Sequence, residues 1–160
     1  MRYFIQKMAT AIIALSISWS ALAADFESLK ALAESGDAQS QLGLAKHYRT
    51  LVRPDYRIFN NEPIDFYNED KDVDDNAKKA FSWYLKAANQ GNAIAQAKVG
   101  GIYHDGIYVP LDHTKAFEWY QKAVKEDVAE AQFGLALIYA YGNEIPKDPK
   151  KSKYWLEKAA

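Results

Sequence analysis

The chain has 160 residues, of which 49% are hydrophobic, and its formal net charge is −1. That length suits one domain, and the apolar fraction is too high for a largely disordered chain. The 20 basic residues are balanced by 21 acidic ones, so there is no basic surplus for binding nucleic acid. The absence of cysteine excludes disulfides, thiolate metal sites and a cysteine nucleophile.

Residues 1–23 have the pattern of a secretory signal peptide, and their short length is typical of bacterial signals. Arg2 and Lys7 give a positively charged start, and an apolar run follows. The Ala-Leu-Ala tripeptide at residues 21–23 then supplies the small residues that signal peptidase recognises. We predict cleavage at this point, which leaves a mature chain from Ala24 with a net charge of −3. The alternative is an uncleaved anchor, but the run is short for a membrane span and contains four hydroxyl side chains.

Internal repetition organises the rest of the chain. Residues 80–88 (AFSWYLKAA), 116–124 (AFEWYQKAV) and 152–160 (SKYWLEKAA) align at a constant offset of 36 residues. A partial earlier copy begins at Gly36 with an offset of 55 residues, so about 19 extra residues lie between it and the second copy. Ahead of it, residues 26–35 indicate one more short helix. A period of this length is typical of stacked helix pairs, because one pair cannot bury its apolar face alone.

Each unit predicts two antiparallel helices. In the second unit, residues 95–104 form the first helix, Gly106 ends it with positive φ, and Asp112 is the expected N-cap of the next helix. Small residues of the first helix, such as Gly100, allow a neighbouring helix to approach closely. The second helix covers residues 114–125 and has one apolar stripe at spacings of three and four residues. The stripe consists of Ala116, Trp119, Tyr120 and Ala123.

A longer pattern, A-x-x-x-L-x-x-x-Y-x-x-G-x-x-V-x-x-D-x-x-K-A-x-x-W-Y-x-K-A-A, runs through the units. In the second unit its residues are Ala95, Val99, Tyr103, Gly106, Val109, Asp112, Lys115, Ala116, Trp119, Tyr120, Lys122 and Ala123. In the third they are Ala131, Leu135, Tyr139, Gly142, Ile145, Asp148, Lys151, Trp155, Lys158 and Ala159. In these positions, over most of residues 36–160, the chain resembles the Sel-one-like repeat (SLR) family, which is related to the tetratricopeptide repeats.

This resemblance implies an all-α fold, a right-handed α-solenoid of antiparallel helix pairs with about three repeats, over residues 24–160. The chain departs from the pattern in three places. Asp127 stands where the preceding unit has Gly91, Ser152 replaces the usual alanine, and the first unit carries an insertion at about residues 51–75. The insertion contains four aromatic residues, eight acidic residues and three basic ones. It is expected either to fold back as a lid or to form a second contact surface.

A search for chemistry finds no catalytic or metal-binding pattern. His47, His104 and His113 lack the i, i+4 spacing of a zinc-binding helix. The acidic run at residues 70–75 lacks the Gly and Glu that a calcium loop needs at its sixth and twelfth positions. We expect it instead to precede a helix that begins near Asn76 and to stabilise the positive end of that helix. Serine elbows and phosphate loops are absent, so we expect no metal, no cofactor and no enzymatic activity.

Partner binding is expected on the first helix of each unit, which in related solenoids lines the concave face. On the last of these helices, residues 133, 137 and 141 form an apolar stripe that stacking does not account for. The alternative is that the chain's own insertion covers this stripe. With the matching positions of the earlier units, the predicted partner-binding residues are Gln39, Leu42, Lys46, Arg49, Ile94, His104, Asp105, Glu130, Phe133, Leu137 and Tyr141.

We therefore expect an exported protein-interaction module, periplasmic or secreted, that binds a protein partner and neither binds nucleic acid nor inserts into a membrane after signal cleavage. The resemblance implies roles such as an envelope adaptor or an immunity protein against an effector secreted by a competing cell. A single small domain fits a dedicated binder of one partner. The alternatives are an enzyme acting on envelope glycan, which needs two convergent carboxylates in a pocket, and a structural spacer that binds through the solenoid ends.

Overall fold

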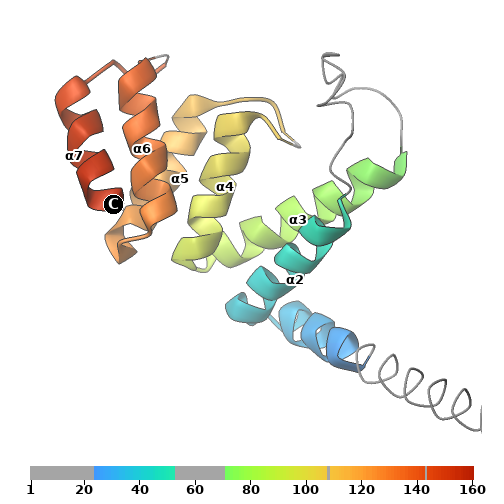
Figure 1. Ribbon diagram of the computed structural model, residues 1–160. Coiled ribbons are helices and arrows are strands. Elements are labelled where there is room, and N and C mark those ends of the chain that lie inside the picture. Colours follow the sequence, from blue (N-terminus) through green and yellow to red (C-terminus); the bar gives the residue numbers. More distant parts are fainter. Residues whose placement is uncertain (1–23, 53–70, 108, 143) are drawn as a thin grey trace, which may run out of the picture.

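The structure is a computed structural model that describes residues 24–52, 71–107, 109–142 and 144–160 (Figure 1). Within these ranges every regular element is a helix, which confirms the predicted all-α class. Residues 24–34 form the first helix. The elements that follow are α2 (Ala38–Leu51), α3 (Lys71–Asn89), α4 (Ala93–Asp105), α5 (His113–Ala123), the short 3₁₀ helix η2 (Val124–Glu126), α6 (Ala129–Tyr141) and α7 (Pro149–Ala159). Among the described residues, none of these helices is both long and apolar enough to cross a bilayer.

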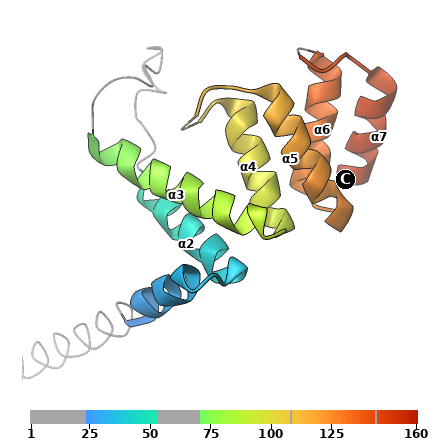
Figure 2. The ribbon, with the colours of Figure 1, turned by 180° about the vertical axis from the view of Figure 1, so that it is seen from behind.

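The helices pack as pairs, and the pairs stack. α2 packs on α3, α4 on α5 and α6 on α7, while α3 with α4 and α5 with α6 join successive pairs. α4 and α6, the first helices of their pairs, also pack directly on each other, so the first helices form the tighter, inner layer. Figures 1 and 2 show the result as a row of helices, with the helix of residues 24–34 at one end and α7 at the other. This arrangement confirms the predicted solenoid of helix pairs.

Equivalent aromatic contacts recur at the predicted offset. Phe81 on α3 meets Tyr103 on α4 edge to face, with ring centroids 5.8 Å apart, and Phe117 on α5 meets Tyr139 on α6 in the same way at 5.7 Å. Edge-to-face pairs of this kind add to the stabilisation that apolar burial already gives. Each pair joins the second helix of one unit to the first helix of the next, so the units are held together by the same contact.

The three tryptophans of the repeat are all half-buried, but the third differs in its contacts. Trp83 and Trp119 each have the lysine three residues later above the ring, at 3.7 and 3.9 Å from the ring centre. Trp155 instead meets Tyr154, with centroids 5.0 Å apart. The predicted equivalence therefore extends to the placement of Trp155 but not to the cation above its ring.

Polar side chains cap four of the helices. Asp37, Asn92, Asp112 and Asp148 each accept a hydrogen bond from a backbone N–H three residues on, at the start of α2, α4, α5 and α7. The predicted cap at Asp112 is thus confirmed, at 2.8 Å from the N–H of Lys115. Hydrogen bonds from Lys115 lower the pKa of Asp112 below its ordinary value of 3.8. The stabilisation by this cap is therefore present above pH 3.8 and is lost as the pH falls through the lowered pKa.

A residue with positive φ precedes the first helix of each pair. It is Gly36 (φ 104°) before α2, Gly91 (φ 90°) before α4 and Asp127 (φ 52°) before α6. Aspartate tolerates this conformation better than most residues, whereas a β-branched side chain is strained there. We expect Asp127→Gly to keep or raise the free energy of unfolding, by up to about 1 kcal/mol, and Asp127→Val to lower it by about 1–2 kcal/mol. Urea unfolding of both variants tests this, and equal midpoints would contradict it.

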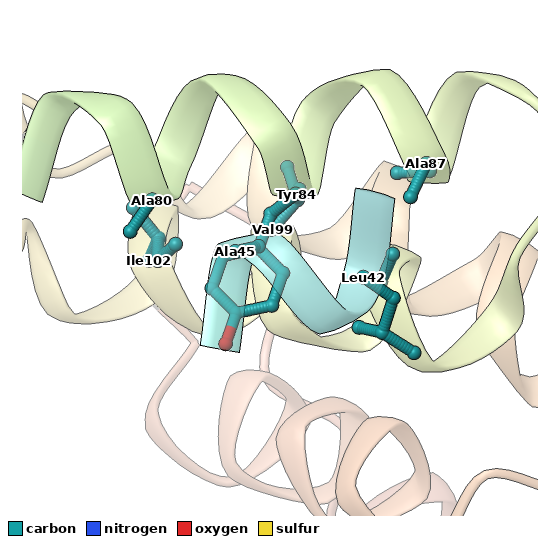
Figure 3. Close-up of a cluster of buried hydrophobic side chains, with 9 residues drawn as sticks. Leu42, Ala45, Ala80, Tyr84, Ala87, Val99 and Ile102 are labelled. Carbon is teal, nitrogen blue, oxygen red and sulfur yellow. The ribbon is translucent and has the colours of Figure 1, made fainter. Parts of the chain in front are cut away.

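The core follows the seams between helices. One cluster joins α2, α3 and α4 and is drawn in Figure 3; its labelled residues are Leu42, Ala45, Ala80, Tyr84, Ala87, Val99 and Ile102. A second cluster joins α4, α5, α6 and includes the predicted stripe residues Ala116, Tyr120 and Ala123. Alanine at most of these positions lets the helix backbones approach closely, and the large residues fill the space between them.

Tyr120 occupies the most tightly packed point of the second cluster. Its ring is 4% exposed and lies between two glycines, Gly100 on α4 and Gly134 on α6. A Cβ atom on Gly100 would lie 2.7 Å from the ring, and one on Gly134 would overlap it. Burial, with smaller contributions from Asp105 and Glu130, raises the pKa of Tyr120, so its hydroxyl stays protonated. The prediction that glycine within these helices serves close packing is confirmed.

The start of α3 differs from the sequence expectation. The helix begins at Lys71 and not near Asn76, so all of the acidic run after Asp70 belongs to its first turns. Residues 1–23 and 53–70, which include the predicted signal peptide and most of the predicted insertion, lie outside the described residues. Whether the insertion forms a lid or a contact surface therefore stays a prediction.

Candidate partner-binding surface

Leu42 was predicted to contact a partner, and this prediction is wrong. The side chain is 1% exposed and lies in the core beneath α3, next to Ala87 (Figure 3). The error comes from the position of Leu42 on α2. It matches Ala97 on α4 and Phe133 on α6, and in a stack this position faces the following unit. Ala97 is fully buried for the same reason, in the cluster that α4 shares with α5 and α6.

Phe133 holds this same position in the last unit, where the described chain has no following helix to cover it. Its side chain is 49% exposed. The predicted stripe of α6 is therefore divided between two surfaces. Phe133 lies on the end of the stack. Tyr141, which is 70% exposed, and the half-buried Leu137 lie further round α6, toward the inner face, which is the surface formed by the first helices α2, α4 and α6.

The inner face also contains the first turns of α4 and α6. Ile94 is exposed there, at the start of α4. Glu130, at the start of α6, forms an ion pair with Lys98 of α4, with Oε2 and Nζ 2.5 Å apart. Both side chains are partly solvated, so the pair contributes little to stability and mainly fixes where the charges lie. Ile94 and Tyr141 are at opposite ends of the inner face, because one begins α4 and the other ends α6.

The predicted basic end of the surface is present on α2. Lys46 and Arg49 are both exposed. Gln39, also exposed, accepts a hydrogen bond from the Asn92 side chain at 3.1 Å, which places the start of α2 beside the start of α4. Of the four α2 residues predicted to contact a partner, three are therefore accessible and only Leu42 is not.

His104 and Asp105, the other predicted contact residues of α4, lie at the C-terminal end of this helix. The Nδ1 atom of His104 lies 2.8 Å from a carboxylate oxygen of the exposed Asp105. The His104 ring is half-buried, and its centroid lies 5.3 Å from that of His113 and 6.5 Å from that of Tyr120. His104 is therefore partly packed against α5, while Asp105 remains available to a partner. The described residues contain no cluster of His, Asp and Glu that could hold a metal ion.

The outer face of the stack has a cavity of about 530 Å³ that the sequence did not predict. It lies between α5 and α7, above α6. Its apolar wall includes Trp155, Leu135 and Tyr139, and its lysines are Lys122 and Lys125. Glu118 is the single carboxylate among its lining residues, so this cavity lacks the two convergent carboxylates that a glycan hydrolase needs.

Phe133 on α6 shares the end of the stack with exposed residues of α7, which the sequence analysis did not predict. At the 36-residue offset, Leu156 matches Tyr120 and Tyr84, the two buried seam residues of the earlier units. Leu156 is instead 45% exposed. Lys153 matches Phe117 and Phe81 and is exposed as well. The repeat alignment shows these two substitutions, but only the structure shows that no helix of the described residues covers the two positions.

The Sel1 repeat family matches residues 65–92, 93–128 and 129–160. These three segments cover more than half of the chain, and the protein belongs to the Sel1 repeat family. Proteins built from these repeats generally mediate protein–protein interactions. The comparison with curated proteins finds no match.

Two solved structures show the same fold. A Sel1 repeat protein from Oxalobacter formigenes is 27% identical, with a TM-score of 0.63, and the match covers 83% of this chain and 87% of that one. A protective antigen present in uropathogenic Escherichia coli strains, which displays an SLR fold, is 31% identical, with a TM-score of 0.62. That match covers 84% of this chain but 25% of the antigen, so this chain resembles only a part of it.

Proposed function

We propose that this protein is an exported interaction module that holds a protein partner on the inner face of its helix stack. The repeat family supports the interaction role. The observation that carries the inner-face site is the exposure of Tyr141 and Ile94, two large apolar side chains that the two core clusters leave in solvent. Large apolar side chains that remain accessible on a helical scaffold are typical of contact sites for other proteins.

The charges on the inner face define what kind of partner fits. Lys46 and Arg49 give the α2 end a positive character, the Lys98–Glu130 pair joins α4 to the start of α6, and Tyr141 leaves an apolar group at the end of α6. We propose a partner with an acidic segment over α2 and an apolar side chain against Tyr141. Opposite charges would align the partner and speed its association, while burial of the apolar anchor would supply most of the affinity.

Within this class we propose an immunity protein that binds a secreted effector, with an envelope adaptor as the second role. Both roles require export, which the predicted signal at residues 1–23 supports. Mass spectrometry of the protein from periplasmic extract tests export, because cleavage predicts a chain that begins at Ala24. A gene for a toxin beside the gene for this protein would favour the immunity role over the adaptor role.

Affinity capture from periplasmic extract, with the purified wild-type protein as bait, tests the interaction. We expect one partner in stoichiometric amount. Tyr141→Asp is expected to reduce its recovery by about tenfold or more, because it places a charge in the apolar contact. The free energy of unfolding should change by less than about 0.5 kcal/mol, since the side chain is mostly solvated.

Tyr154→Asp is the matched control, because Tyr154 is an exposed tyrosine on α7, away from the inner face. It should leave capture unchanged. If both tyrosine variants keep the partner, the inner face is not the binding site. If the wild-type bait captures no partner in stoichiometric amount, the interaction role itself is contradicted.

A further inference from the structure

In the last helix pair of the described chain, α6 and α7, large apolar side chains at core positions of the repeat are exposed. In the earlier units the residues that face the next helix are buried: Ala97 in the first helix of a unit and Tyr120 in the second. Their counterparts in the last unit are Phe133 and Leu156, and both are nearly half exposed. These two residues lie on adjacent helices, α6 and α7, which pack on each other. Together they form an apolar end face of the kind that a further helix covers elsewhere in this molecule.

The charge on this end face is positive. Lys153 stands where Phe81 and Phe117 pack against the tyrosine of the following helix. Lys153 also forms an exposed ion pair with Glu157 of its own helix at 3.7 Å, and the whole of α7 contains four lysines and one glutamate, a net charge of +3. A helix that covers this face must therefore bring acidic side chains to Lys153 as well as a surface that fits Phe133 and Leu156.

The opposite end of the same molecule has these properties. The helix of residues 24–34 lies at the far end of the row from α7 in both views (Figures 1 and 2). Asp25, Glu27 and Glu34 are exposed on it, against one partly buried lysine, which gives a net charge of −2. The exposed side chains also include the small Ser28 and Ala31, and Leu32 beside them. Small side chains offer space for large ones, so the two ends match in size as well as in charge.

We propose that a second copy of this chain covers the end face, with its helix of residues 24–34 packed on α6 and α7. Phe133 and Leu156 of one copy then contact the small residues of the other, and Lys153 meets Glu27. The contact uses two different surfaces, so it repeats from copy to copy and yields a series of oligomers of increasing length instead of a closed dimer. This proposal is independent of a partner on the inner face, which the end-to-end contact leaves open.

Analytical ultracentrifugation over a wide range of protein concentration tests the association. The weight-average mass is expected to rise above that of the monomer as concentration increases, and to rise less at high salt, because salt screens the charges. Leu156→Asp should keep the protein monomeric. Lys153→Glu and Glu27→Lys should each weaken association by about tenfold or more, because each places like charges opposite one another.

Mixing the two charge variants gives the sharpest result. The Lys153→Glu end of one variant faces the Glu27→Lys end of the other, and the remaining two ends keep the wild-type charges. The mixture should therefore form alternating oligomers, although each variant alone associates about tenfold or more weakly than the wild type. Lys125→Glu, an exposed lysine on η2 away from both ends, is the control and should associate like the wild type. Circular dichroism melting of each variant confirms that the fold is intact.

Two results would overturn the proposal. A wild-type protein that stays monomeric at every concentration would show that the end face is a solvated cap of the solenoid. Association that persists unchanged in Leu156→Asp and in both charge variants would place the contact elsewhere on the surface. Neither result would affect capture of a partner by the inner face, which Tyr141→Asp tests separately.

Discussion

Replacement of Tyr84 by alanine is expected to lower the free energy of unfolding by about 3–5 kcal/mol. Tyr84 is the largest fully buried side chain of the described residues, and its ring lies among Leu42, Ala87 and Val99 at the junction of α2, α3 and α4 (Figure 3). The surrounding residues are mostly alanines on helices that other contacts hold in place. They cannot move in to fill the space, so the truncation leaves a cavity.

The repeat provides a matched control for this substitution. Leu156 is the counterpart of Tyr84 two units later, but it is open to solvent. Leu156→Ala should therefore cost less than about 1 kcal/mol, because little area returns to water and no cavity forms. Chemical unfolding of both variants measures the difference. If Tyr84→Ala and Leu156→Ala cost the same, the first seam is not packed as the structure shows.

The repeat offset made most of the fold predictable. Ala116, Trp119, Tyr120 and Ala123 form a stripe at helical spacing. The structure buries Ala116, Tyr120 and Ala123 between α4, α5 and α6, and it leaves Trp119 half-buried against the first cluster. Asp112 precedes its helix in the position of a cap, and it accepts the expected hydrogen bond. These features depend on residues close together in the sequence, or on contacts that recur in every unit. For this reason local pattern and offset were sufficient.

The partner surface was harder to predict because α4 and α6 are apolar on more than one side. Periodicity shows that a second apolar face exists, but it does not show whether a neighbouring unit covers that face. Leu42 was placed on the surface for this reason, although the next unit buries it. A comparison along the offset would have separated the two cases, because Leu42, Ala97 and Phe133 hold one position and only the last is uncovered.

The end face shows the opposite error, because residues at positions that are buried in the earlier units are exposed there. Leu156 and Lys153 appear in the sequence as substitutions of Tyr120 and Phe117, with no sign that their surroundings differ. Their exposure follows from the number of helices packed on α7, which is a property of the stack and not of the helix itself. The sequence therefore predicts what each unit contains, while the stack determines which copies of a position are accessible.

The second large effect is expected at Gly134, which allows α6 to lie against the ring of Tyr120. Gly134→Ala should lower the free energy of unfolding by about 2–3 kcal/mol, the cost of overpacking a filled core. The added Cβ would overlap the ring, and the ring cannot turn away because Gly100 of α4 lies on its other side, with room only for a hydrogen. The loss should appear although alanine favours a helix over glycine by about 1 kcal/mol.

Gly43 provides the control for this prediction, since it is the counterpart of Gly134 in the first unit. A Cβ there would lie 3.2 Å from the end of the Leu29 side chain, which is flexible and only partly buried. Gly43→Ala should therefore be neutral or stabilise the protein by up to about 1 kcal/mol through helix propensity. Thermal and urea unfolding of both variants tests the pair. If Gly134→Ala is as harmless as Gly43→Ala, α6 does not lie against Tyr120, and the second seam of the stack is packed differently.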